Sequence, residues 1–431
     1  MSEPKQSPPR TNRSRRDFLK ASALTAGAAL GSMPLVAVGA QETKRKFKAA
    51  LIGCGGRGNG AAANHLEAVK YLNDKLGWQI EVEFVATADW FDGRAKGAGK
   101  RYGVPEERCF GGADCYKKAL DVGPDIVVMA QPPVFRPRHF EAAIKAGKHV
   151  FFEKPSAVDP PGIRRVIGAG EEAKKKGLCV VAGTQRRHSE GYGRTAREIQ
   201  GGVKGRVIAG RVAWNMGRIF TNTPVNPTGP DQLVGPWQIW VEMSGDHICE
   251  QHVHNLDIAN WFIGTHPTSA GGFGFRARRV AGNMYDFFSV DLEYPGGVHV
   301  HSMCRQVADC WNWVGESFAY EKVDNSDAEI APDPYEKVGY HGNAYVAEHA
   351  HLLYGIVTGE PINEAQNVAW ATGAAILARE SAYTGKRISW KDMFEDPNGK
   401  FYNLQLKPAA EDFETGEITL LKDGDIRIPG V

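Results

Sequence analysis

The chain has 431 residues, of which 42% are hydrophobic, and its 52 lysines and arginines nearly balance its 50 acidic residues. Residues 1–40 carry six of the basic and two of the acidic residues, so 46 basic and 48 acidic residues remain in the rest of the chain. This balance argues against a nucleic-acid-binding surface, and the length predicts two or three domains. The seven scattered cysteines do not form a disulfide framework, and we expect them to be small core residues.

The first 40 residues have the organisation of an export signal. Ser14-Arg15-Arg16-Asp17-Phe18-Leu19-Lys20 precedes an apolar run over residues 21–40. Paired arginines, an apolar stretch and a small-residue cleavage site are typical of a twin-arginine signal peptide. Glycines and a proline interrupt the run, which disfavours a membrane anchor. We therefore expect cleavage after Ala40, with Val38 at the −3 position. The twin-arginine export machinery would be a partner, and the mature protein would be periplasmic or otherwise exported, without a stable membrane span.

Short apolar strands alternate with helical segments between residues 44 and 185. We expect strands at 47–52, 81–88, 125–130, 149–152 and 178–182, and the helices between them include 138–146 and 161–176. Short buried strands that alternate with helices predict an α/β domain with a doubly wound parallel sheet.

The pattern changes between residues 186 and 390. Longer alternating strands are expected at 207–214, 270–278, 287–294 and 298–304, with helices at 346–358 and 367–384. Tyr294-Pro295-Gly296-Gly297 is a hairpin signal between two of these strands. This region predicts an α+β domain with an open, mostly antiparallel sheet. Residues 391–431 are rich in Pro, Gly and Asp, and we expect them to form a tail on the surface.

A glycine-rich loop follows the first predicted strand. Gly53, Gly55 and Gly58 form a GxGxxG pattern between that strand and a helix. The first glycine permits a tight turn, the second lets the backbone approach a pyrophosphate, and the third allows close packing of helix on strand. A merely glycine-rich turn is the alternative, but the strand–loop–helix context favours a Rossmann-type dinucleotide site. The other residues expected around this cofactor are Gly56, Arg57, Asp89, Gln131, Glu153 and Lys154.

Asp89 ends the second predicted strand, 31 residues after Gly58. A long helix explains why this spacing exceeds the usual ~20 residues. A carboxylate at this position accepts hydrogen bonds from the adenosine ribose and repels a 2′-phosphate. Trp90 and Phe91 supply no cation for such a phosphate, so we expect NAD, although Arg94 is near enough to leave NADP open.

The fourth predicted strand ends in Glu153-Lys154-Pro155. Pro155 stops the strand and holds Lys154 extended, at the edge of a parallel sheet where ligands bind. A solvated lysine at a strand end is an equally good interpretation of this motif alone.

A second group of polar residues lies at 245–257. If this segment is one helix, His247, Glu250, His254 and Asp257 share a face. A carboxylate one turn from a histidine can orient the ring and raise its basicity, as a general base requires. Surface histidines and a metal site are the alternatives. The segment lacks the HExxH spacing of a metal site, and we predict no metal ligand.

Together these motifs resemble the Gfo/Idh/MocA oxidoreductases over about residues 47–390. The resemblance rests on the glycine loop, residues 153–155, Gly183-Thr184-Gln185-Arg186-Arg187 and the acidic and histidine residues of 250–257. It implies catalytic roles for Lys154 and His254, an acidic site residue at Asp257, and a basic residue near the nicotinamide at Arg186. The family's aspartate four residues before the histidine is replaced here by Glu250. The family's second domain often mediates oligomers, which implies a dimer or tetramer.

Three functions are compatible with these residues. The first is NAD(P)-dependent oxidation of a hydroxyl of a small sugar or polyol. His254 would take the proton, Lys154 would stabilise the alkoxide, and Glu250 and Asp257 would hold neighbouring groups. Tryptophans suit the apolar faces of sugars, and the candidates are Trp237, Trp240, Trp311 and Trp313.

The second function is a redox-neutral, NAD-dependent cleavage of glycosides by a hydrolase or lyase, and the third is non-catalytic sugar binding. Retention of Lys154 favours the first over the second, and retention of Lys154, His254 and the glycine loop together argues against the third. Because an exported enzyme has no obvious soluble pool of dinucleotide, we expect a cofactor that is loaded before export, held tightly and recycled in place.

Overall fold

The computed structural model describes residues 44–322 and 327–430, and the predicted signal peptide lies outside the described residues. Among the described residues, no helix combines the length and the apolarity needed to cross a membrane. Six of the seven cysteines are buried, as predicted for small core residues, and Cys310 is exposed.

The first sheet contains six strands, all of them parallel, in the order β3-β2-β1-β4-β5-β6. The strands are β1 (Lys44–Ile52), β2 (Gln79–Asp89), β3 (Cys109–Gly111), β4 (Ile126–Met129), β5 (His149–Phe152) and β6 (Val180–Ala182). The predicted doubly wound sheet is confirmed. Only β3 was not expected, because three residues carry too little periodicity to be recognised.

Both faces of this sheet are buried, which explains why its strands are short apolar runs. In β1, Ala50 and Ile52 face one core, whereas Ala49 and Leu51 face the other. Helices α2 (Gly56–Leu76), α3 (Asp92–Tyr102) and α12 (Ala344–Thr358) cover one face, and α4 (Cys115–Asp121), α5 (Arg136–Lys145) and α6 (Pro160–Lys175) cover the other. The long helix α2 explains the late position of Asp89.

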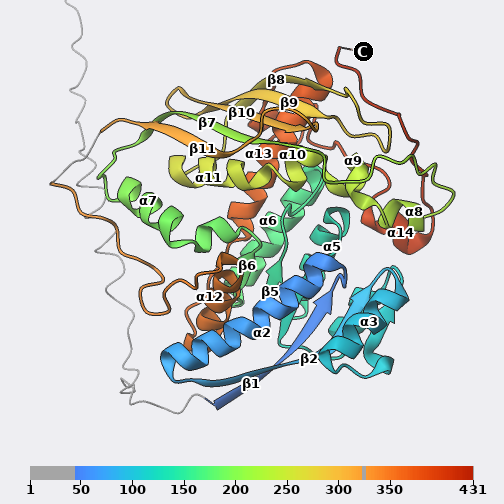
Figure 1. Ribbon diagram of the computed structural model, residues 1–431, viewed down its shortest axis with the longest axis vertical. Coiled ribbons are helices and arrows are strands. Elements are labelled where there is room, and N and C mark those ends of the chain that lie inside the picture. The colour runs from blue at the N-terminus through green and yellow to red at the C-terminus, as the bar shows by residue number, and fades with distance from the viewer. Residues whose placement is uncertain (1–43, 323–326, 431) are drawn as a thin grey trace, which may run out of the picture. The chain divides into compact units, whose positions relative to one another are not determined.

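The second sheet has the order β11-β7-β10-β9-β8-β12. Its strands are β7 (Val207–Met216), β8 (Ser269–Phe275), β9 (Phe287–Tyr294), β10 (Val298–Gln306), β11 (Trp313–Tyr320) and β12 (Ile388–Ser389). The β7–β10 pair is parallel and the other pairs are antiparallel. The prediction of a mostly antiparallel sheet is confirmed, and the parallel pair makes the sheet mixed. Helices α11 (Val253–Ile263) and α13 (Ala365–Thr384) lie between this sheet and the first domain (Figure 1).

The prediction of one helix through residues 245–257 is wrong. Helix α10 (His247–Glu250) ends before α11 begins at Val253. In a continuous helix the carbonyl of Glu250 would accept the N–H of His254. That carbonyl instead accepts a hydrogen bond from Lys154 Nζ at 2.6 Å, and the N–H of His254 points to the Gln251 carbonyl at 3.4 Å. The break in the helix is therefore coupled to the position of the lysine.

The C-terminal segment differs from the predicted surface tail, because several of its side chains lie in the core. A short π-helical turn (Lys391–Glu395) buries Met393 and Phe394. Leu406 is also buried, and helix α14 (Ala410–Thr415) buries Phe413. This segment therefore contributes to the packing of the domain that it crosses.

Candidate active site

The glycine loop has the geometry of a dinucleotide-binding turn. Gly53 has φ +90°, and a Cβ there would lie 2.3 Å from the backbone nitrogen of Gln131. A Cβ on Gly58 would lie 1.7 Å from the Gly53 carbonyl oxygen, so helix and strand can approach only with glycine at this position. A Cβ on Gly55 would meet nothing within 4 Å. The backbone is therefore open at the N-terminus of α2, where phosphate groups bind in such folds.

A cavity extends from this loop along the carboxyl ends of the strands, and Asp89 and Arg94 line it. Asp89 Oδ2 accepts the N–H of Cys54 at 2.7 Å, and Oδ1 accepts the N–H of Phe91 at 2.9 Å. Burial raises the pKa of this carboxyl, and the two N–H bonds oppose that shift. Each oxygen retains a lone pair that can accept a hydrogen bond from a ribose hydroxyl.

Gln131 follows β4 and faces the same cavity. Its side chain is buried, and neither its amide oxygen nor its amide nitrogen has a hydrogen-bond partner among the described residues. Buried amides are normally paired, so these two atoms indicate a polar ligand. The first turn of α2, which begins at Gly56, carries no acidic residue that would repel a phosphate. The cavity therefore fits a dinucleotide.

A second cavity, the catalytic cleft, adjoins the first, because Ala130 and Trp237 line both. Lys154, Glu250 and His254 line this cleft. Lys154 Nζ donates to the Glu250 carbonyl oxygen at 2.6 Å and lies 3.3 Å from Glu250 Oε1. This pairing holds the ammonium group at the carboxyl end of β5, next to the cleft.

His254 is buried in the wall of the catalytic cleft, where its ring stacks on Trp214 with centroids 5.9 Å apart. Burial, followed by the positive charges of Lys154, Arg186 and Arg57, holds the pKa of His254 well below 6.5. The imidazole is therefore neutral near pH 7 and can accept a proton. Its ring lines the cleft, where a ligand can reach it.

Two predictions about the acidic residues near His254 need correction. The carboxylate of Glu250 contacts Lys154, so it does not orient His254. Asp257 is buried, and both of its oxygens accept hydrogen bonds from Arg187 at 2.8 to 3.0 Å. Asp257 therefore lies outside the cleft lining and cannot hold a substrate hydroxyl, because it is buried and both of its oxygens are engaged by Arg187. His247 is also fully buried and pairs with Asp246.

Arg57 and Glu153, predicted as cofactor ligands, contact each other at the wall of the cleft. Arg57 Nε donates to Glu153 Oε1 at 2.5 Å, and its Nη2 lies 3.6 Å from the buried Glu348. The Arg57 guanidinium also lies over the ring of Tyr345, 4.7 Å from its centroid. These contacts direct Arg57 into the catalytic cleft instead of toward the phosphate site at Gly55.

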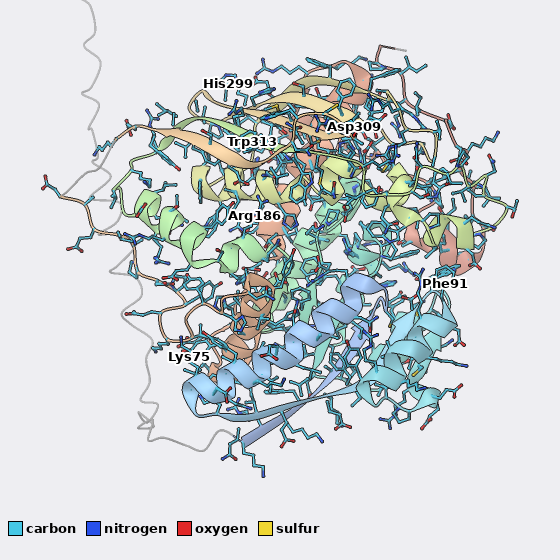
Figure 2. The ribbon with its side chains drawn as sticks, viewed as in Figure 1. Lys75, Phe91, Arg186, His299, Asp309 and Trp313 are labelled. Carbon is cyan, nitrogen blue, oxygen red and sulfur yellow. The ribbon has the colours of Figure 1, made fainter. Side chains whose placement is uncertain are left out.

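Of the predicted substrate residues, only Trp237 lines the cleft. Arg186 pairs with Glu316 behind Trp214. Trp240 is fully buried and donates to the Gln232 carbonyl at 3.2 Å, so it is a core residue. Trp311 is 67% exposed, and its ring stacks on Trp313. Figure 2 shows Trp313 on the second sheet and Arg186 between the two domains.

Several cleft residues were not predicted from the sequence. Trp214 ends a predicted strand, and Gln185 belongs to the motif at residues 183–187. The sequence therefore carries a signal at both positions. Tyr345 and Phe220 carried none, because they come from a helix start and a loop far away in sequence. The unpredicted cleft residues include Arg136, Gln185, Trp214, Phe220 and Tyr345.

A dinucleotide cavity that opens into a lysine–histidine cleft defines a two-domain oxidoreductase of the Rossmann type. Residues 47–184 match the model described as oxidoreductase family, NAD-binding Rossmann fold, and residues 194–315 match the GFO/IDH/MocA C-terminal domain. The two matches follow each other and together cover more than half of the chain. The chain belongs to the Gfo/Idh/MocA family, and the cofactor of its Rossmann domain is NAD.

The curated relatives match part of the chain. The chain is 27% identical over 195 residues to scyllo-inositol 2-dehydrogenase (NAD(+)) of Bacillus subtilis, covering 44% of this chain and 49% of the relative. It is 28% identical over 176 residues to 2,7-anhydro-N-acetylneuraminate hydratase of Escherichia coli, covering 40% and 43%. The chain thus spans about half the length of these relatives.

A solved structure of levoglucosan dehydrogenase with NADH and levoglucosan has the same fold. Its TM-score is 0.63 at 14% identity, and the match covers 80% of this chain and 99% of that one. At this identity the similarity concerns the fold alone.

Proposed function

We propose that this protein is an exported, NAD-dependent oxidoreductase that acts on a hydroxyl group of a sugar or polyol. The observation that carries the proposal is the junction of the two cavities at Ala130 and Trp237. This junction connects the dinucleotide cavity with the cleft that holds Lys154 and His254. The name of one curated relative, an inositol dehydrogenase, supports a polyol substrate.

The cleft residues divide the chemistry between them. His254, neutral near pH 7, accepts the hydroxyl proton of the substrate. Lys154 donates a hydrogen bond to the same oxygen and stabilises the negative charge that develops there. Oxidised NAD, held by Asp89, Gln131 and the N-terminus of α2, would supply the acceptor for the hydride. The product is the corresponding carbonyl compound.

The test is turnover of purified protein on a panel of inositols, anhydrosugars and free sugars, measured as formation of the carbonyl product, because a cofactor that is regenerated in place does not accumulate as NADH. We expect His254→Ala and Lys154→Ala to lower kcat by at least about 100-fold, the contribution of one acid–base group. His299→Ala is the matched control, because His299 is exposed on the second sheet and pairs with Asp291. Full turnover by either cleft variant on an identified substrate would contradict the assignment.

A redox-neutral reaction is the second candidate, and the relative named as a hydratase favours it. In such a reaction a sugar hydroxyl is oxidised transiently, a neighbouring group leaves, and the product is reduced again. Lys154 and His254 would serve both reactions. A cleaved or rearranged product at the same oxidation level as the substrate would favour this candidate over net oxidation.

The export signal leads to a proposal about the cofactor. Twin-arginine substrates cross the membrane folded, so the dinucleotide would be loaded in the cytoplasm and carried across. No soluble pool would replace it outside, and a second substrate would regenerate it in place. Mass spectrometry of small molecules released from denatured native protein would identify a resident dinucleotide, and rapid exchange with added NADH would contradict residence.

A further inference from the structure

The C-terminal segment reaches the dinucleotide cavity from outside. Helix α14 lies beyond residues 47–184 and 194–315, the two ranges that match the family models. In Figure 1 it lies next to α8 (Asp231–Val234), at the side of the domain where α3 is found. Its position raises the question of what it does for the cavity.

Phe413 of α14 forms an outer layer of the cavity wall. Its ring packs edge-on against Trp90, with centroids 5.5 Å apart, and against Phe135, with centroids 5.0 Å apart. Trp90 and Phe135 themselves line the dinucleotide cavity. Phe413 is buried, so neither of these two aromatic rings can swing outward while α14 is in place.

Glu414, the next residue, ties α14 to two helices of the Rossmann domain. Its carboxylate accepts hydrogen bonds from Lys117 Nζ at 2.6 Å, from the Tyr116 hydroxyl at 3.0 Å and from Arg138 Nη2 at 2.9 Å. Tyr116 and Lys117 belong to α4, and Arg138 belongs to α5. Both helices border the cavity, because Cys115 and His139 line it.

The second domain also holds Trp90, through a hydrogen bond to α8. Trp90 Nε1 donates to Asp231 Oδ1 at 2.6 Å, and Val234, a few residues further on, lines the cavity. Trp90 is thus fixed between Asp231 and Phe413. A dinucleotide that leaves past Trp90 must first break one of these two contacts.

The ion pairs that Glu414 forms with Lys117 and Arg138 persist over a wide pH range. The three hydrogen-bond donors lower the pKa of Glu414 to about 2 in spite of partial burial, and the carboxylate raises the pKa of Arg138. The tie therefore remains ionised at any pH that an exported protein commonly meets. Charge-assisted hydrogen bonds of this kind are stronger than neutral ones.

We propose that α14 is a strap that retains the dinucleotide, and that Phe413 and Glu414 set the rate at which the dinucleotide leaves. The proposal rests on the proposed function in that a dinucleotide must occupy the cavity. Both residues are positioning residues, because they act through Trp90, Phe135 and the helices α4 and α5. The strap accounts physically for a cofactor that stays bound after export.

The experiment measures the binding and release rates of NADH by stopped-flow fluorescence, using the whole chain. Glu414→Gln removes the charge at constant size. Phe413→Leu removes the ring that packs against Trp90 and Phe135 while keeping an apolar side chain. Glu417→Gln is the matched control, because Glu417 is an exposed residue of the same segment. We expect Glu414→Gln and Phe413→Leu to release NADH about tenfold faster or more. We expect the binding rate to rise as well, because a strap hinders passage in both directions.

Three results would overturn the proposal. If both variants release NADH as slowly as the wild type while the melting temperature falls, α14 only stabilises the fold. If release accelerates but binding does not, the residues contribute contact energy without gating passage. If the wild-type chain binds no NADH, the proposed function fails together with the strap. Should Phe413→Leu not fold, Glu414→Gln and its control still decide, because the Glu414 side chain is partly exposed, at 14%, and glutamine has the same size.

Discussion

Replacement of Gly58 by alanine tests the geometry of the cofactor loop most directly. The new Cβ would lie 1.7 Å from the Gly53 carbonyl oxygen, whereas real Cβ contacts do not fall below 3.0 Å. The loop must therefore move by about 1.3 Å. A helical alanine gains roughly 0.5–1 kcal/mol over glycine, but overpacking of this kind costs about 1–3 kcal/mol. We expect a net loss of up to about 2.5 kcal/mol in the free energy of unfolding, and NADH affinity reduced about tenfold or more.

Gly60→Ala is the control, because it places the same methyl group on the same helix two residues further on. Its Cβ would have Arg57 Nη1, at 3.6 Å, as its nearest neighbour, which is an ordinary contact. This variant should gain stability by roughly 0.5–1 kcal/mol and bind NADH normally. Chemical denaturation and fluorescence titration measure the two quantities. If Gly58→Ala were as stable as Gly60→Ala and bound NADH as tightly, the reasoning would be refuted. The close approach of β1 and α2 would then not depend on glycine at position 58.

Three further predictions concern other parts of the site and its surroundings. Asp89→Ala leaves the Cys54 and Phe91 N–H groups unpaired. It should destabilise the protein by about 1–3 kcal/mol and weaken NADH binding, as measured by denaturation and titration. Asp423→Ala removes the acceptor for the N–H groups of Val225, Asn226 and Gly282, which fix the loop that brings Phe220 into the cleft. It should raise KM for the substrate in steady-state kinetics and leave NADH affinity unchanged. Burial lowers the pKa of His65 to about 4 and that of His139 to about 3. Their neutral forms therefore contribute stability that is complete above pH ~6.5 and is lost as the pH falls toward those values, by up to about 1.4 kcal/mol per pH unit for each histidine. Denaturation from pH 7.5 to 5 should show this slope, and His139→Phe, which retains the stack on Tyr116, should reduce it.

The parts of the site that the sequence predicted are those built by local chain geometry. Gly53, Gly55 and Gly58 act within six consecutive positions of a strand–loop–helix unit, and Asp89 ends the neighbouring strand. Parallel strands place their carboxyl ends at one edge, so position in the sequence determines position in space. For the same reason Lys154, at the end of β5, could be placed beside the dinucleotide cavity before the structure was known.

The partners of these residues could not be predicted in the same way. The helical spacing of Glu250 and His254 gave the wrong arrangement, because the Lys154 ammonium takes the carbonyl that a continuous helix would need. That contact joins residues 96 positions apart in sequence, and local periodicity contains no information about it. Asp257 likewise finds Arg187 at a separation of 70 residues.

The C-terminal segment shows a further reason why composition misleads. Its prolines, glycines and acids predict a surface tail, and much of its backbone has no regular structure. Leu406 and Phe413 are nevertheless buried, and both belong to the core that also contains residues of α4, α5 and α6. An extended segment fixed at separate points has no common period in its apolar residues, so periodicity cannot identify them. In such a segment the informative pattern is an isolated aromatic residue next to an acidic one, as in Phe413-Glu414. The aromatic ring can pack into the core while the carboxylate binds basic residues of a neighbouring helix.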